Sequence, residues 1–178
     1  MMTNSVSDPP SPLPEPGARP TRVLAKQVVV AVLWVTAVSV IGQKLTDLGP
    51  WYQALKQPAW KPPDWAFGVI WSSVFVLIIV AAVLAWRRAR HPAQRVQMLA
   101  LWGINSMLHM TWSLLFFTIK RPDWAMWELP LLWLSIAAII VTLWRISRLA
   151  AVLLLPYITW VTIAGFLNYA NVQLNGPF

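Results

Sequence analysis

The sequence contains no cysteine, six acidic residues and two histidines among its 178 residues. The absence of cysteine excludes disulfide bonds, thiolate nucleophiles and cysteine-ligated metal or iron–sulfur sites. The sequence also lacks an HExxH zinc motif and a glycine-rich phosphate loop, the common signatures of zinc hydrolases and nucleotide-binding proteins. Because acid–base catalysis requires positioned ionisable groups, we expect no metal site, no required cofactor and little machinery for hydrolysis or group transfer.

Charge is scarce and apolar residues are abundant. Charged residues make up 11% of the chain and hydrophobic residues 58%, with 13 tryptophans and a mean hydropathy of +0.58. Soluble domains have about 25% charged residues, and a soluble fold of this length has too little polar surface to cover so much apolar mass. The composition therefore predicts an integral membrane protein. The net charge of +8 does not indicate a nucleic-acid partner, because the basic residues flank apolar runs instead of forming one patch.

The apolar runs predict the domain organisation. Residues 1–24 contain six prolines among polar residues, which predicts a disordered tail. Five apolar runs follow, and about 20 residues suffice for a helix to cross the hydrocarbon core. We therefore predict an all-α integral membrane domain over residues 25–178. Its fold is a compact bundle of five transmembrane helices, at about 26–46, 65–86, 96–119, 124–145 and 149–171, joined by short connections.

The basic residues predict the orientation of this multi-pass chain. One side of the predicted bundle carries nine of them: Arg19, Arg22, Lys26, Arg87, Arg88, Arg90, Arg95, Arg145 and Arg148. The opposite side carries five: Lys44, Lys56, Lys61, Lys120 and Arg121. Since basic residues are enriched in cytoplasmic loops, we expect a cytoplasmic N-terminus and a C-terminus on the other side.

Four motifs stand out along the chain. The first predicted connection, residues 49–67, reads GPWYQALKQPAWKPPDWAF, a proline-stiffened aromatic loop that also suits a plain interfacial aromatic belt. Trp71 follows in the second helix. Residues 112–117 read WSLLFF, and residues 156–160 read PYITW, with Leu-Asn pairs at 167–168 and 174–175. In this order the motifs resemble the translocator protein family, also called TspO/MBR, peripheral-type benzodiazepine receptors or tryptophan-rich sensory proteins, over residues 25–178.

The resemblance implies a five-helix bundle, often a homodimer, whose members bind porphyrins such as protoporphyrin IX. Some members bind cholesterol or benzodiazepine-type drugs, and some bacterial members degrade protoporphyrin in light. By motif match, the resemblance implies these ligand-binding positions: Tyr52, Trp71, Asn105, His109, Trp124, Trp160 and Ala164. The cholesterol motif of some members is not matched, because no basic residue follows Tyr169.

Helical spacing independently places several of these residues in two stripes, each along one face of a helix. Asn105, His109, Trp112 and Phe116 are spaced i, i+4, i+7 and i+11, along one face of a helix. His109 lies near the middle of its apolar run, so its side chain is expected to face the bundle interior. It either lines a pocket or hydrogen-bonds a neighbouring helix, and axial ligation of a haem iron is a further alternative. The family usually has asparagine here, so ligand preference does not transfer directly.

The second stripe consists of Trp160, Ala164 and Asn168, spaced i, i+4 and i+8. Ala164 suits either close helix packing or room for a flat ligand. Pro156 removes a helical hydrogen bond just before the stripe, and we expect a kink there. Glu128, one turn inside the fourth predicted helix, is costly in lipid and is expected to face inward or pair with a nearby basic residue.

These observations lead to one predicted function and two alternatives. A porphyrin is a flat apolar disc with carboxylates, which suits aromatic faces together with Lys56 and Lys61. We predict a membrane tetrapyrrole-binding sensor or receptor, with protoporphyrin IX or haem as ligand. The first alternative is light- and oxygen-dependent porphyrin breakdown shaped by Trp71 or Trp160. The second is a transporter of tetrapyrroles or other lipophilic molecules, for which the absence of internal repeats is unfavourable.

Overall fold

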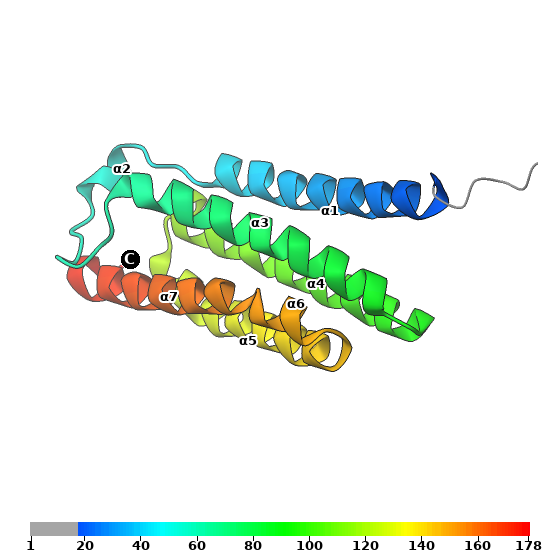
Figure 1. Cartoon of the computed structure of the whole chain (residues 1–178). Helices are drawn as coiled ribbons and strands as arrows, with labels where there is room; N and C mark the ends of the chain where they lie inside the picture. The colour runs from blue at the N-terminus through cyan, green and yellow to red at the C-terminus, as the bar shows by residue number, and fades with distance from the viewer. Residues whose placement is uncertain (1–17) are drawn as a thin grey trace, which may run out of the picture.

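The computed structural model describes residues 18–178, and their regular structure is helical. Residues 1–17, which make up most of the predicted tail, lie outside the described residues. The elements, coloured along the chain in Figure 1, are α1 (Ala18–Leu45), α2 (Pro50–Ala54), α3 (Asp64–Arg88), α4 (Pro92–Ser113), the π-helical turn η1 (Leu114–Thr118), α5 (Pro122–Ile146), α6 (Arg148–Val152) and α7 (Leu155–Asn175).

Within residues 18–178, four helical segments are long and apolar enough to cross a membrane. They are Arg22–Leu45, Asp64–Arg88, Pro122–Ile146 and Arg148–Asn175, and an 18-residue stretch of each has a mean hydropathy of 2.1, 2.7, 2.0 and 2.0, respectively. The prediction of an all-helical, multi-pass membrane protein is therefore confirmed. The helix α4 is also long, with 22 residues, but its buried polar side chains lower its hydropathy: Asn105, Ser106, His109 and Ser113.

Several predicted boundaries were wrong. Because α1 begins at Ala18, residues 18–24 belong to a helix and not to the tail. The predicted helix 96–119 starts earlier, at Pro92, where the side chains of His91 and Gln94 form a capping box, and it ends in the π-helical turn η1. The predicted helix 149–171 is two helices, α6 and α7. They separate just before Pro156, which has no N–H to continue the hydrogen-bond ladder. The short helix α2 was not predicted.

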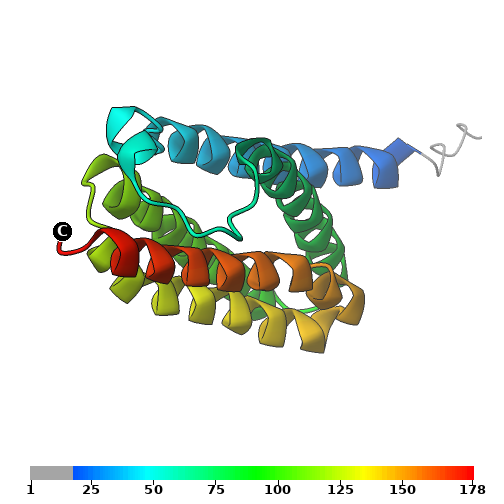
Figure 2. The same cartoon turned by 90° about the vertical axis from the view of Figure 1, so that its left-hand side faces the viewer.

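The long helices are arranged in a ring. The helix α1 packs on α3 and α4, α5 packs on α4 and α7, and α3 reaches α6. Thus α3 packs mainly against α1 and α6, and not against α4, which follows it in the sequence. A hydrogen bond joins the neighbouring helices α1 and α4, in which Trp34 Nε1 donates to Ser106 Oγ at 3.1 Å. Figure 2 shows the connection from α2 descending towards α7 before it returns to α3.

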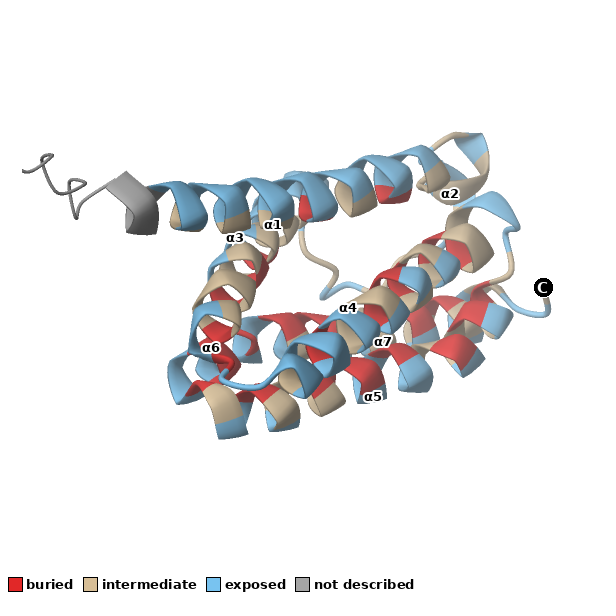
Figure 3. Cartoon of the chain, turned by 90° about the vertical axis from the view of Figure 1, so that its right-hand side faces the viewer, coloured by how far each residue is buried: buried red, intermediate tan, exposed pale blue. Residues whose placement is uncertain are grey.

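The tightly packed core occupies the α6 end of the ring. Small side chains there are fully buried and let α3 and α6 approach closely: Ala81, Ala85, Ala150 and Ala151. Larger residues of α5, among them Ile136, Ile139 and Leu143, are buried in the same cluster. Figure 3 shows the buried residues concentrated on α5, α6 and α7, whereas α1 is mostly exposed. The core thus ends before the α2 end of the ring is filled, and that end holds the cavity described next.

Candidate ligand-binding cavity

A cavity of about 440 Å³ lies at the α2 end of the ring. Its size falls within the range of small-molecule sites, about 300–1,000 Å³. Residues of α1, α2, α3, α4, η1, α5 and α7 all contribute to its lining. Aromatic side chains dominate its wall: Tyr52, Phe67, Trp71, Phe75, His109, Trp112, Phe117 and Trp160.

Trp71 of α3 organises one side of this wall. Its ring centroid lies 4.8 Å from that of His109, at an interplanar angle of 66°. It lies 6.5 Å from that of Trp160, at 88°. Trp160 in turn meets Phe67 edge-on, with centroids 5.5 Å apart. Edge-to-face contacts of this kind are the favoured geometry for aromatic rings. They join α3, α4 and α7 through one continuous aromatic surface, although these helices are distant in the sequence.

A second aromatic group closes the cavity beneath α2. The ring of Tyr52 lies 5.6 Å from that of Phe117, and Trp51 meets Phe116 at 6.3 Å. The π-helical turn η1 changes the direction of successive side chains at this point. Phe117 faces the cavity, while Phe116 is buried and stacks on Trp112 at 5.3 Å. The WSLLFF motif therefore supplies both a lining ring and the packing behind it.

The aromatic loop, residues 49–67, is hydrogen-bonded to the C-terminal turn of α7. The backbone N–H of Lys56 donates to Asn175 Oδ1 at 2.7 Å, and Asn175 Nδ2 donates to the carbonyl oxygen of Lys56 at 3.0 Å. Asn175 Nδ2 also reaches the carbonyl oxygen of Asn171 at 2.9 Å. The final Leu-Asn pair of the sequence thus holds the loop against the last turn of α7.

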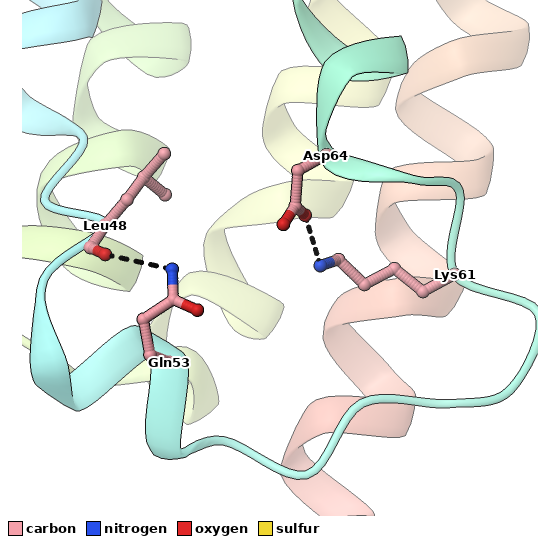
Figure 4. Close-up of polar contacts among 4 residues, drawn as sticks. All are labelled: Leu48, Gln53, Lys61 and Asp64. Atoms are coloured by element: carbon pink, nitrogen blue, oxygen red, sulfur yellow. Dashed lines mark hydrogen bonds and ion pairs between the residues drawn. The ribbon is translucent and has the colours of Figure 1, made fainter.

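Polar groups surround the mouth of the cavity (Figure 4). Lys61 forms an ion pair with Asp64, and Gln53 Nε2 donates to the carbonyl oxygen of Leu48 at 3.3 Å. Partial burial lowers the pKa of Lys61, but the hydrogen bond and attraction to Asp64 outweigh it and raise this pKa above its usual value. Lys61 therefore carries a positive charge at the rim of an apolar cavity.

Five of the seven residues implied by the motif match lie together on the cavity wall. They are Tyr52, Trp71, His109, Trp160 and Ala164. Tyr52 comes from α2, Trp71 from α3, His109 from α4, and the remaining two from α7. The two stripes therefore reach the same cavity, the first at His109 and the second at Trp160 and Ala164. The asparagine at the end of each stripe does not line it.

Asn105 and Trp124 are not among the residues that line this cavity, and their part in binding stays a prediction. Asn105 points between helices: its Nδ2 donates to Ser135 Oγ at 2.9 Å, and Tyr157 Oη donates to its Oδ1 at 3.2 Å. A buried amide requires such partners, and here they lie on α5 and α7. Trp124 is 49% exposed on the first turn of α5, and the guanidinium of Arg121 lies 4.2 Å from its ring centroid.

The buried groups His109 and Glu128 each agree with one of the alternatives expected for them, since His109 lines the cavity and Glu128 faces inward. His109 Nδ1 has no hydrogen-bond partner within residues 18–178, so its ring lies against Trp71 and the cavity without a bond to a neighbouring helix from that atom. Both carboxylate oxygens of Glu128 likewise lack a partner in the described part of the chain. The expected pairing of Glu128 is not found, and Arg121 pairs with Asp123 instead.

Sequence reasoning missed the contribution of α1. The lining includes Ser39, Gly42 and Gln43 of α1, which are spaced i, i+3 and i+4 on one helical face, and Thr46, which follows its last residue. A Cβ atom on Gly42 would lie 3.9 Å from Nε2 of His109, so α1 passes directly over the imidazole. A stripe of small and polar residues within an apolar run could have predicted from the sequence that α1 lines the cavity.

Comparisons with known proteins agree with these features. Residues 28–174 match the sequence model of the TspO/MBR family. The chain is 37% identical over 127 residues to "Protein CrtK" of Rhodobacter capsulatus, covering 71% of this chain and 79% of that protein. It is 34% identical over 129 residues to the "Tryptophan-rich protein TspO" of Chlorobaculum tepidum, covering 70% and 79%. It is 32% identical over 120 residues to the human "Translocator protein", covering 67% and 71%.

Proposed function

The chain belongs to the TspO/MBR family, and we propose that it is a membrane sensor that binds a tetrapyrrole such as protoporphyrin IX in the cavity beneath α2. The observation that carries this proposal is the composition of the cavity wall, in which aromatic rings from five elements face a space of about 440 Å³. A porphyrin is flat and apolar, so it gains most from stacking on such rings. Its carboxylates would reach the polar mouth.

A titration in the dark tests this proposal. Protoporphyrin IX bound among Trp71, Trp160 and Tyr52 should quench the intrinsic tryptophan fluorescence of the purified protein in detergent micelles. Tyr52→Ala and Trp160→Ala should each weaken binding by roughly 1–3 kcal/mol, the value of one buried aromatic contact. Trp127→Ala is the matched control, because Trp127 is 79% exposed and outside the cavity lining.

The titration has a clear contradicting outcome. If both cavity variants bind with the affinity of the Trp127→Ala control, the ligand does not occupy this cavity. The melting temperature of each variant in the same micelles shows whether the fold is intact, so a weakened affinity in a well-folded variant is specific to the site.

The proposal extends to five spans and a defined orientation. The helix α4 with η1 covers Pro92–Thr118, and from Met98 to Met110 its exposed large side chains are the apolar Leu99, Ile104 and Met107, whereas the polar Asn105, Ser106 and His109 are buried. These polar residues face inward, as expected for a span that lines a cavity. Figure 1 places the start of α1, the end of α3 and the turn from α5 to α6 at one end of the bundle. That end carries most of the arginines, so we propose that it is cytoplasmic.

Light-driven breakdown of the bound porphyrin by dioxygen is a second candidate. The observation that favours it is the pair Trp71 and Trp160, two oxidisable indoles 6.5 Å apart that both line the cavity. We propose binding without efficient breakdown as the main activity. A defined photoproduct from the wild type that disappears in Trp160→Phe at equal porphyrin occupancy would reverse this order, because a phenyl ring keeps most of the stacking area without indole chemistry.

A further inference from the structure

One basic side chain is built into the mouth of the cavity. The side chain of Lys61 is only 16% exposed. Its Nζ lies 5.5 Å from the ring centroid of Tyr52 and 5.9 Å from that of Phe67, and it pairs with Asp64. These three partners all line the cavity. Figure 4 shows the Lys61 side chain extending from the loop into the mouth, opposite Gln53.

The other basic residues at this end are placed differently. Lys44 and Lys56 are both exposed, and the backbone of Lys56 is held by Asn175. The amine of Lys120 lies 6.0 Å from the ring centroid of Trp51, which is not a lining residue. Arg121 is paired with Asp123. Among the residues that the structure describes at this end, Lys61 has the amine positioned to meet a ligand in the cavity.

The two members of the Lys61 ion pair have unequal environments. The side chain of Asp64 is 68% exposed, so water can solvate its carboxylate when the pair opens, and exposed ion pairs add little stability. The side chain of Lys61 is mostly covered, with its amine within 6 Å of two aromatic rings, so a carboxylate partner stabilises the ammonium where part of its water shell is lost. Its partner can therefore be exchanged at low cost, provided that another carboxylate takes the place of Asp64.

We propose that Lys61 selects carboxylated ligands, by exchanging the carboxylate of Asp64 for a carboxylate of the tetrapyrrole bound in the cavity. This inference rests on the proposed function. A charge-assisted hydrogen bond from the ammonium to the ligand is stronger than a neutral one. Asp64 holds the amine in place when the cavity is empty and competes with the ligand when it is filled. Uncharged lipophilic molecules gain nothing from this exchange.

The test compares protoporphyrin IX with its dimethyl ester, which has the same ring and no ionisable carboxyl. Lys61→Met keeps an aliphatic stem and removes the amine. We expect it to weaken binding of the acid about tenfold or more, as for other hydrogen bonds to charged groups, and to leave binding of the ester unchanged. Asp64→Asn should tighten binding of the acid several-fold and leave the ester unchanged. Lys44→Met is the matched control and should affect neither ligand, because Lys44 is exposed in the last turn of α1 and does not line the cavity.

The outcomes separate this inference from the proposed function. If Lys61→Met weakens the acid and the ester equally, Lys61 only supports the loop, and the inference is overturned. Unchanged affinity of the acid in Lys61→Met also overturns it, as does weaker binding of the acid in Asp64→Asn. If the wild type binds neither the acid nor the ester, the proposed function itself fails.

Discussion

Gly165 of α7 lies against the Leu129 side chain of α5, and replacing it with alanine tests how tightly the cavity wall is packed. A Cβ atom added at Gly165 would lie 2.9 Å from Cδ2 and 3.5 Å from Cδ1 of Leu129. Leu129 itself lines the cavity. The added methyl group therefore forces the Leu129 side chain to move by several tenths of an ångström, which couples the α5–α7 contact to the shape of the site.

The expected magnitude follows from two opposing effects. Alanine is favoured over glycine in a helix interior by about 1 kcal/mol, whereas overpacking costs about 1–3 kcal/mol. Gly103→Ala in α4 isolates the first effect, because a Cβ atom there meets nothing within 4 Å. The atoms that the methyl group meets are the ends of the Leu129 side chain, which borders the cavity and can turn aside. Gly165→Ala should therefore be less stable than Gly103→Ala by about 1–2 kcal/mol, the lower part of the overpacking range, since helix propensity cancels in the comparison.

Thermal unfolding in detergent micelles measures the difference, and protoporphyrin IX titration measures its effect on the site. We expect Gly165→Ala to lower the melting temperature and the affinity, and Gly103→Ala to lower neither. In a Leu129→Ala background the clash is absent, so adding Gly165→Ala should cost no more than adding Gly103→Ala. Equal stability of Gly165→Ala and Gly103→Ala in the wild-type background would refute the reasoning.

Three further predictions concern the network, the loop and the orientation. Asn105→Leu should destabilise the protein by about 1–3 kcal/mol, because it leaves the buried Ser135 hydroxyl without its donor. Thermal unfolding together with porphyrin titration should show lower stability at unchanged affinity. A selective loss of affinity would instead mean that Asn105 takes part in binding. Asn175→Ala removes both hydrogen bonds to the loop, so porphyrin should dissociate faster in stopped-flow measurements, and an unchanged rate would mean that the loop does not cover the ligand. Because the chain has no cysteine, single cysteines at Ser11 and Gly176 report orientation, and an impermeant reagent in intact cells should label the latter alone.

The stripe on α4 illustrates how far periodicity reaches. Its spacing correctly predicted that Asn105 and His109 both face inward, since both are buried. It could not predict what each side chain meets there. Asn105 meets hydroxyl groups from Ser135 and Tyr157, whereas His109, one turn further along, meets Trp71 and the cavity. The difference arises because the core ends between these two levels of the bundle.

Trp124 illustrates a limit of the motif match. The motif match carried a role to this position, but the residue lies on the first turn of α5 and stacks against Arg121. A match of residue type in sequence does not specify which side of a helix faces the pocket. The contribution of Ser39 and Gly42 was missed for a related reason, since α1 was interpreted only as an apolar span.

The sequence by itself determined that this is a membrane protein, that its fold is helical, and to which family it belongs. Each of these depends on sums over neighbouring residues or on short ordered motifs, and the chain carries them without reference to its fold. Only the tertiary structure decided where the core stops and the cavity begins. That boundary depends on contacts between helices distant in the sequence, such as the alanines that close α3 onto α6 and the aromatic rings that keep α3 and α7 apart near α2. This boundary is set by the volumes of the side chains that face one another across the bundle. Which side chains face one another is known only once the helices have been placed.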